Sequence, residues 1–153
     1  MDTTLPDELT GALVVAVDDS APSREALRYA AEMATEQHRP LHVVSVWNFV
    51  HGPAPELEPD EAPTTAAWQA EAERRLSALV AEELAGRELD VRTTVLHGNT
   101  VPVLLQVSHA ARHLVVGSRG RGGFTGLLLG STSEQLVHYA GAPVTVVREG
   151  TTT

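Results

Sequence analysis

The sequence of 153 residues contains no cysteine and no lysine, and all eleven of its basic residues are arginines. Without cysteine it has no disulfide, thiolate nucleophile or Cys-ligated metal, and a reducing compartment is expected. Without lysine it lacks the phosphate-binding lysine of a P-loop and any Schiff-base lysine. Aromatic residues make up only 4% of the chain. The core must therefore be aliphatic, which suits a Val- and Leu-rich sheet covered by Ala-rich helices.

Positive charge is also scarce, and the formal net charge is −9. Such a chain repels phosphate backbones and anionic lipid unless it carries a basic cluster, and no basic run is present, so neither nucleic acid nor a membrane is an expected partner. The acidic first eight residues lack an apolar stretch, and no run approaches the ~18 apolar residues of a membrane span. We expect a cytoplasmic protein with one domain over residues 1–153 and a core at about 11–149.

Apolar runs alternate with stretches of helical periodicity along the chain. The runs predict five buried strands, at residues 12–17, 41–47, 91–96, 113–116 and 143–148. Between them, the periodicity and the capping residues predict helices over 20–38, from 64 or 65 to just before 86, from 100 to about 111, and over 131–139. Residues 48–63 carry four prolines among acidic residues and are predicted to form an extended loop.

This alternation predicts an α/β fold, an open doubly wound sheet of five parallel strands with helices on both faces. We predict the strand order 3-2-1-4-5, although the sequence alone also permits other orders. In that order the first and fourth strands are neighbours, and a crevice opens at their carboxyl ends, where ligands of such folds bind. Asp18 and Gly117 follow these two strands.

Residues 117–130 are rich in glycine and lead into the last predicted helix. Glycines let the backbone approach a ligand closely, and successive N–H groups can form a cradle for phosphate. The N–H groups and hydroxyls of Ser131, Thr132 and Ser133 would add donors at the helix N-terminus. The alternative is a tight turn in which Ser131 only caps the helix. No P-loop and no dinucleotide fingerprint is present.

The spacing of Gly117, Gly120, Gly130 and Ser131 is similar to the ATP-binding signature of universal stress proteins. The resemblance covers nearly the whole chain, including Val-Ala-Val-Asp-Asp-Ser, Leu-His-Val-Val-Ser-Val-Trp, Leu-Val-Val-Gly-Ser-Arg-Gly-Arg-Gly-Gly and Pro-Val-Thr-Val-Val-Arg. It implies an adenine nucleotide alpha hydrolase-like fold that binds ATP.

The resemblance also implies roles for individual residues. Asp18 would lie beside the nucleotide, Ala16 and Val44 would line the adenine, and Val116 would complete the base pocket. The remaining contacts, to ribose and phosphate, would come from Gly117, Gly120, Gly130 and Ser131. Asp19 departs from the pattern, because family members commonly carry glycine there.

Two adjacent carboxylates repel a triphosphate, so we expect Mg²⁺ to bridge it to Asp18 or Asp19, directly or through water. Arg119 and Arg121 flank the loop and are secondary candidates for phosphate contacts.

We expect a bulkier residue at Gly117 to block nucleotide binding and to leave the fold intact. Trp47 is expected to fill the core, and most of the seven histidines are expected at the surface.

The predicted function is that of an ATP-dependent regulatory module acting on an unidentified protein partner in stress response. No catalytic residue is predicted, because neither a lysine nor a general base for the γ-phosphate is evident. The alternatives are a nucleotide-free dimeric interaction module, a slow ATPase and an adenylate-transferring enzyme. The resemblance implies a homodimer formed through the last strand, with Val144, Val146 and Arg148 in the interface.

Overall fold

The structure, a computed structural model, describes residues 3–50, 52–120 and 128–150. Within these ranges the strands are β1 (Leu13–Ala16), β2 (Leu41–Trp47), β3 (Val91–His97), β4 (His113–Gly117) and β5 (Val144–Val147). The helices are α1 (Ala21–Glu36), α2 (Thr65–Glu83), α3 (Thr100–Ala110) and α4 (Ser131–Tyr139), preceded by the 3-10 turn η1 (Asp7–Leu9).

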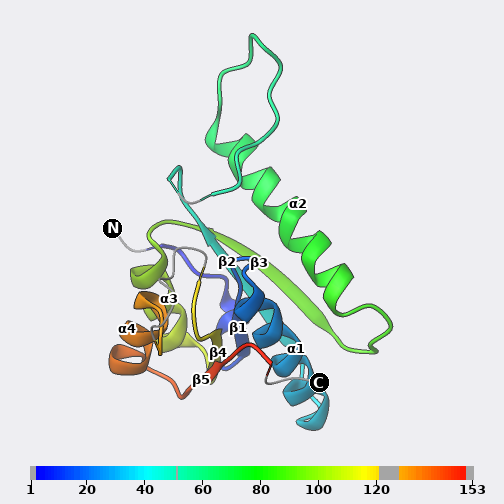
Figure 1. Cartoon of the computed structure of the whole chain (residues 1–153), viewed down its shortest axis with the longest axis vertical. Helices are drawn as coiled ribbons and strands as arrows, with labels where there is room; N and C mark the ends of the chain where they lie inside the picture. The colour runs from blue at the N-terminus through cyan, green and yellow to red at the C-terminus, as the bar shows by residue number, and fades with distance from the viewer. Residues whose placement is uncertain (1–2, 51, 121–127, 151–153) are drawn as a thin grey trace.

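In the described part of the chain, the five strands form one parallel sheet in the order β3-β2-β1-β4-β5 (Figure 1). The predicted fold class and strand order are confirmed. β1 is one residue shorter at each end than predicted, because only residues 13–16 pair regularly with β2. Val17 still donates its backbone N–H to the carbonyl of Val44 at 2.9 Å, so the chain stays extended beyond the strand.

Capping residues set the starts of the first two long helices. The Ser20 hydroxyl accepts the N–H of Ser23 at 3.3 Å, and Pro22 occupies the first turn of α1. At α2, the Thr64 hydroxyl accepts the N–H of Ala67 at 3.0 Å. Both contacts satisfy amides that have no partner within the helix, which is why the predicted starts agree with the structure.

The side chains of alternate strand residues pack into two separate hydrophobic cores, one on each face of the sheet. Leu13 and Val15 of β1 pack with α1 and α2, whereas Val14 packs with α3 and α4. Several β1, β2 and β4 residues have no exposed surface. Burial on both faces explains the continuous apolar runs in the sequence.

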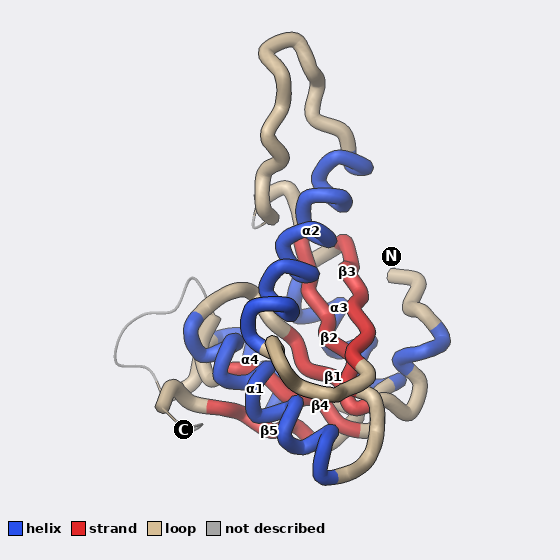
Figure 2. Tube along the Cα trace, turned by 90° about the vertical axis from the view of Figure 1, so that its right-hand side faces the viewer, coloured by secondary structure: helices blue, strands red, loops and turns tan. Residues whose placement is uncertain are grey.

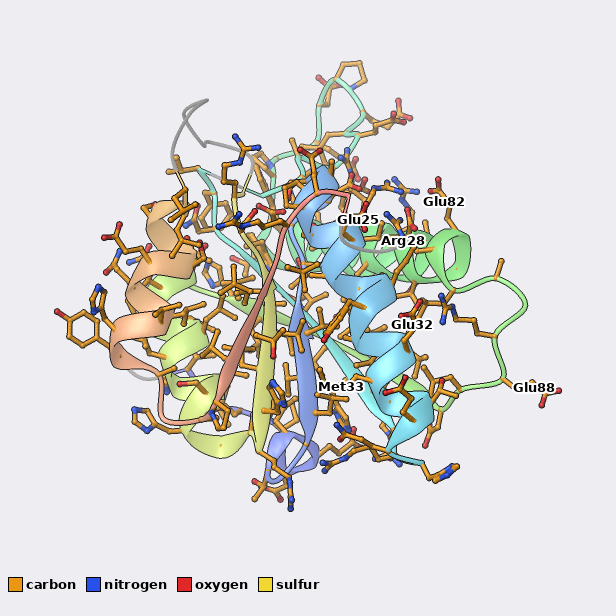
Figure 3. The ribbon with its side chains drawn as sticks, turned by 60° about the horizontal axis from the view of Figure 1, so that its bottom comes forward. Glu25, Arg28, Glu32, Met33, Glu82 and Glu88 are labelled. Carbon is orange, nitrogen blue, oxygen red and sulfur yellow. The ribbon has the colours of Figure 1, made fainter. Side chains whose placement is uncertain are left out.

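A cluster of ion pairs joins α1 to the end of α2. Arg24 contacts one Glu83 oxygen at 2.8 Å, and Arg28 contacts the other. Figure 3 shows Arg28 pointing toward the end of α2 that carries Glu82. Burial raises the pKa of Glu83, but the hydrogen bonds from Arg24 and Arg28 outweigh it and lower the pKa overall. The cluster therefore favours the folded state as long as Glu83 stays ionised.

The segment between β2 and α2 extends away from the sheet as a long loop, as Figures 1 and 2 show. Its base rests on an aromatic cluster formed by Trp47, Phe49, Trp68 and His97. The Trp47 ring lies 4.3 Å from that of His97 and 5.9 Å from that of Trp68, centroid to centroid. Trp47 is 1% exposed, and its indole N–H donates to Gln69 Oε1 at 2.6 Å. The expected core role of Trp47 agrees with this burial.

His42 differs from the expected surface histidines, since it is only 4% exposed on β2 and its Nδ1 has no hydrogen-bond partner among the described residues. Burial lowers its pKa, and the positive charge of Arg92 lowers it further, although Glu8 and Asp90 act in the opposite direction. The folded protein therefore binds a proton at His42 less readily than the unfolded chain does.

We predict a loss of stability as pH falls below about 6.5, the ordinary histidine pKa. A group with a lowered folded-state pKa is protonated first in the unfolded chain, so each such histidine contributes up to ~1.4 kcal/mol per pH unit of loss. Urea unfolding between pH 7.5 and 5 should show a shallower slope for His42→Leu than for wild type. The pKa of His113 is also lowered, so His113 should account for part of the pH dependence that remains in His42→Leu. Identical slopes for both proteins would contradict this role for His42.

None of the helices in the described ranges combines the length and apolar character needed to cross a bilayer.

Candidate functional site

The carboxyl ends of β1 and β4 lie side by side at one edge of the sheet. The two strands pair in parallel register, Leu13 with His113 and Val15 with Val115. α1 packs on one face of the sheet, and α4 packs on the other. The chain leaving β1 and the chain leaving β4 thus meet at the topological switch point of the sheet, where ligands of such folds bind.

The structure brings Asp18 and Gly120 together at this switch point. Asp18 Oδ1 accepts the backbone N–H of Ser20 at 3.1 Å and its hydroxyl at 2.5 Å. A Cβ built on Gly120 would lie 2.7 Å from Asp18 Oδ2. Gly120 therefore lets the backbone of the glycine-rich loop reach this carboxylate. A single carboxylate at a phosphate cradle is the kind of ligand that Mg²⁺ uses when it binds through a nucleotide, so Asp18 fits the predicted metal contact.

Asp19 adopts the left-handed backbone conformation, with φ of 68°. Glycine enters this region without steric cost, whereas another residue pays about 1–2 kcal/mol. This conformation is one that glycine adopts readily, which agrees with the glycine that the resemblance implies at this position. In this chain the Asp19 carboxylate pairs with the Arg24 guanidinium at 2.5 Å, which offsets part of the strain and part of the negative charge beside Asp18.

Gly117 is held against the first turn of α1. A Cβ at this position would lie 2.7 Å from the carbonyl carbon of Pro22 and 2.8 Å from the backbone nitrogen of Ser23. These are backbone atoms that cannot rotate away. These contacts argue against the expectation that a side chain at Gly117 would leave the fold intact, because α1 occupies the space beside it.

The N-terminus of α4 faces the loop that leaves β4. Gly130 is the N-cap residue and donates its N–H to the Ser118 carbonyl at 2.6 Å. Ser131, Thr132 and Ser133 occupy the first three helical positions, whose N–H groups have no acceptor within the helix.

Only part of the predicted donor set at α4 fits a phosphate contact. Ser133 is 3% exposed, and its hydroxyl donates inward to the Ser118 carbonyl at 2.9 Å. We expected this hydroxyl to contact phosphate, but it instead ties α4 to the end of β4. The backbone N–H groups of the first turn and the exposed hydroxyl of Ser131 remain as candidates.

The predicted adenine-lining residues meet on the α3–α4 side of the sheet. Ala16 and Val44 are partners in the parallel pairing of β1 with β2, and Val116 lies near the end of β4. Val44 is fully buried and Val116 is 5% exposed. Of the two predicted arginines, Arg119 pairs with Glu149 at 3.6 Å. Arg121 and the rest of 121–127 lie outside the described residues.

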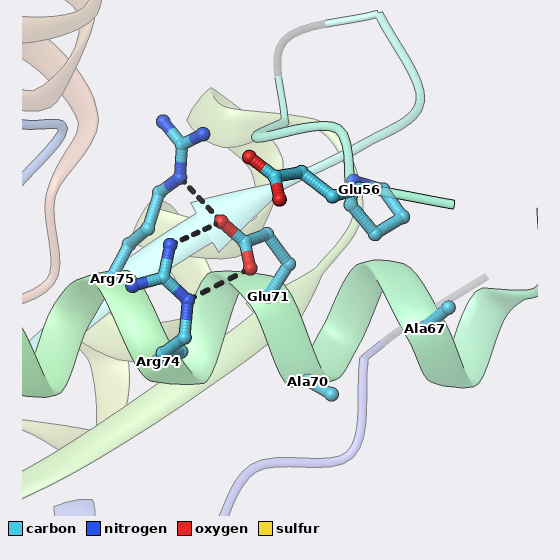
Figure 4. A pocket seen from close by; sticks show the side chains of 7 residues that line it. Glu56, Ala67, Ala70, Glu71, Arg74 and Arg75 are labelled. Carbon is cyan, nitrogen blue, oxygen red and sulfur yellow. Dashed lines mark hydrogen bonds and ion pairs between the residues drawn. The ribbon is translucent and has the colours of Figure 1, made fainter. Parts of the chain in front are cut away.

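Two surface depressions elsewhere are outlined by described residues. One lies between the loop after β2 and α2, where Glu71 accepts hydrogen bonds from Arg74 and Arg75 at 2.7–2.9 Å (Figure 4). These bonds lower the pKa of Glu71 to about 2. The other depression lies at the amino ends of β1 and β4 and is lined by Gln37, Arg39, Arg112, His113 and Pro143. Neither was anticipated from the sequence, and neither includes a predicted site residue.

Among the described residues, no group of three or more His, Asp or Glu side chains is arranged to hold a metal ion.

Known proteins resemble this chain over most of its length. Residues 11–148 match the universal stress protein family. Universal stress protein Rv2005c of Mycobacterium tuberculosis (strain ATCC 25618 / H37Rv) is 36% identical over 140 residues, which cover 88% of this chain and 47% of that protein. The chain thus spans about half the length of the curated relatives it matches.

Solved structures show the same fold at lower identity. A crystal structure of a universal stress protein in complex with cAMP superposes with a TM-score of 0.65 at 20% identity, covering 92% of this chain and 98% of that chain. The universal stress protein from Archaeoglobus fulgidus in complex with dAMP gives a TM-score of 0.58 at 20% identity, covering 91% and 98%. The parallel sheet with its switch-point crevice, the family match over residues 11–148 and the identity to Rv2005c agree with one another. The chain belongs to the universal stress protein family.

Proposed function

We propose that this chain binds ATP together with Mg²⁺ in the crevice between β1 and β4. In this proposal it acts as a cytoplasmic regulatory module of the stress response rather than as a turnover enzyme. One domain over residues 1–153 carries the site. Nucleotide occupancy biases a surface that is presented to a protein partner.

The observation that carries this proposal is the meeting of Asp18, Gly120 and the N-terminus of α4 at the switch point. The Asp18 carboxylate suits the metal, the close approach at Gly120 suits a backbone cradle, and the first amides of α4 suit a phosphate. The resemblance to universal stress proteins adds Gly117, Gly130 and Ser131 to the ribose and phosphate contacts.

Two neighbours of known structure support an adenine nucleotide as the ligand, because one is a complex with cAMP and the other a complex with dAMP. On the α3–α4 side the base would contact the half-buried Ala16 and the exposed edge of Val116, with the fully buried Val44 behind them. Mass spectrometry of nucleotide retained by the purified protein, followed by calorimetry with ATP, ADP, AMP and cAMP, tests the proposal. A protein that retains none of these nucleotides and binds none of them would contradict it.

The metal bridge makes a separate prediction about Asp18. Asp18→Asn should weaken Mg-ATP binding about tenfold, as the loss of one charge-assisted contact would. Asp19→Asn is the matched control, since it removes the same charge from a carboxylate that already pairs with Arg24. Calorimetry should also show weaker ATP binding in excess EDTA. Equal affinity with and without EDTA would rule out the metal bridge.

Slow or absent hydrolysis follows from the lack of a lysine and of an evident general base. Multiple-turnover hydrolysis at about 1 per second or faster, typical of enzymes, would instead support the ATPase alternative. An adenylate-transferring enzyme would instead move the AMP group of ATP to a second substrate. The same assay, with that substrate added, would then show pyrophosphate as the product.

A nucleotide-free interaction module is the second candidate. It is favoured by the full burial of Val44, by the internal hydrogen bond of the Ser133 hydroxyl and by the strained Asp19. Each of these features makes the crevice less accommodating to a nucleotide. The nucleotide-binding experiment above separates the two functions.

We further propose a homodimer through β5, which ends the sheet in the described part of the chain. An edge strand of β-branched residues favours pairing with another strand, and Val144, Val146 and Arg148 would lie in this interface. Light scattering at micromolar concentration should give twice the chain mass. Val146→Asp should give the monomer mass while circular dichroism shows an intact fold. A monomeric wild type would contradict the dimer.

A further inference from the structure

The depression at the amino ends of the strands has an unusual charge for this protein. It is lined by two arginines and a histidine, together with Gln37 and Pro143, and by no carboxylate. The chain carries 20 acidic residues against 11 arginines. Most arginines would therefore be expected to have a carboxylate neighbour. The lining of this depression contains no carboxylate, so its positive charge is not balanced by the residues that line it.

The contrast with the depression beside α2 is direct. There, Arg74 and Arg75 share the carboxylate of Glu71. Arg39 and Arg112, by comparison, take part in none of the ion pairs found between described residues. The first depression is neutralised by the protein itself, and the second is not.

Two hydrogen bonds bring the Arg39 side chain close to the backbone of Arg112. The Arg39 guanidinium donates to the Gly11 carbonyl at 2.8 Å, and the backbone N–H of Arg112 donates to the Ala12 carbonyl at 2.9 Å. Gly11 and Ala12 are consecutive, so their Cα atoms are about 3.8 Å apart. The Arg39 guanidinium and the Arg112 backbone, though distant in sequence, are thus bonded to consecutive residues, and both arginines line the same depression.

His113 forms the third wall of the depression, and a hydrogen bond fixes the orientation of its ring. Its Nε2 lies 2.7 Å from the Thr145 hydroxyl on β5. Burial lowers the pKa of His113, and the positive charge of Arg39 lowers it further, which independently places the Arg39 charge near this ring. An anion bound between Arg39, Arg112 and His113 would balance the positive charge of the two arginines.

We propose that Arg39, Arg112 and His113 form a binding site for a phosphate-type oxyanion, at the edge of the sheet opposite the nucleotide crevice. Guanidinium groups present N–H donors in a planar fork that matches phosphate oxygens, and such charge-assisted hydrogen bonds are the strong ones. The net negative charge of the chain does not prevent binding, because salt screens charges beyond about 10 Å. The site does not depend on nucleotide binding in the crevice.

Another explanation for these arginines is that they stabilise helix ends. Arg39 follows the end of α1, and Arg112 follows the end of α3. Cations are favourable beside the partial negative charge of a helix C-terminus. In that case substitution would lower stability and phosphate would have no effect on the site, so the two explanations give opposite results.

The test is titration of the full chain with inorganic phosphate, followed by NMR of the His113 ring and the arginine side chains. Ionic strength is held constant with sodium chloride. We expect saturable shifts of His113 in the millimolar range and about tenfold weaker binding in Arg112→Gln. Arg112 is exposed, so this variant should fold even if Arg39→Gln does not. Arg87→Gln, which removes the same charge elsewhere, should bind within about twofold of wild type.

A second titration with glycerol phosphate distinguishes the source of the oxyanion. Tighter binding than that of inorganic phosphate indicates a phosphoryl group on a larger molecule, and weaker binding indicates the free ion. His113 signals that stay unchanged under both titrations would overturn the proposal. Equal binding by Arg112→Gln and wild type would also overturn it, whatever happens at the nucleotide crevice.

Discussion

Replacing Gly117 with alanine should destabilise the protein by about 3 kcal/mol, the upper part of the usual range for overpacking. The new Cβ would lie 2.7–2.9 Å from backbone atoms of Pro22 and Ser23 in the first turn of α1. Relief requires α1 to move away from β4. That movement would strain the hydrogen bond from the Asp18 N–H to the Ser23 hydroxyl, which is 3.2 Å long. Urea unfolding followed by circular dichroism measures the loss.

Gly120→Ala is the matched control in the same loop. Its Cβ would meet the Asp18 carboxylate oxygen at 2.7 Å, and this side-chain atom can rotate away. We expect a stability loss of about 1 kcal/mol or less, typical of a surface change, together with weaker nucleotide binding. These results would show that Gly117 is needed for the packing of α1 against β4 and that Gly120 is needed for nucleotide binding. An unchanged unfolding midpoint for Gly117→Ala would show that α1 shifts easily and would contradict this division.

Truncating Trp47 to alanine should cost about 3–5 kcal/mol, as expected for a large buried aromatic side chain. The indole is 1% exposed, stacks on His97 and Trp68, and donates a hydrogen bond to Gln69. Its loss would leave a cavity beneath the start of α2 and an unpaired Gln69 oxygen. Thermal and urea unfolding should both detect the change.

The effect should also be local. A Cβ at Gly52 would lie 3.2 Å from ring atoms of both Trp47 and Trp68, so the loop after β2 closes over these rings. Hydrogen exchange in Trp47→Ala should therefore accelerate most in the loop and in the first turns of α2. Tyr139→Ala is the control, because this aromatic side chain is 68% exposed and its loss should change stability little. A wild-type midpoint for Trp47→Ala would contradict the role of the cluster.

Much of the fold was predictable because it depends on local patterns. β2 was predicted over the residues it occupies, since strands buried on both faces read as continuous apolar runs. Ser20 and Thr64 cap their helices as expected, because a hydroxyl satisfies a free amide within a few residues. The strand order was predicted because a chain that winds outward through the second and third strands must return beside the first, although other orders were also permitted, and the structure confirms it.

The meeting of Asp18 with the backbone of the glycine-rich loop could be anticipated from the sequence, whereas nucleotide binding there stays a prediction. The switch point follows from strand order, and the glycine pattern marks the loop that approaches Asp18. The direction of individual side chains was not predictable. Ser133 is one residue of a polar Ser-Thr-Ser run, yet its hydroxyl turns inward because position three of α4 faces the end of β4.

Local pattern thus determined the strands and the helices, since each depends on periodicity and capping over a few neighbouring residues. The strand order was one of several that the sequence permits, and the tertiary structure decided it. Contacts between distant segments were decided by folding alone. Gly117 against α1, the Asp19–Arg24 pair that reaches α2, and the meeting of Arg39 with Arg112 all depend on how layers pack in three dimensions. A linear pattern carries no record of which side chains meet across a sheet.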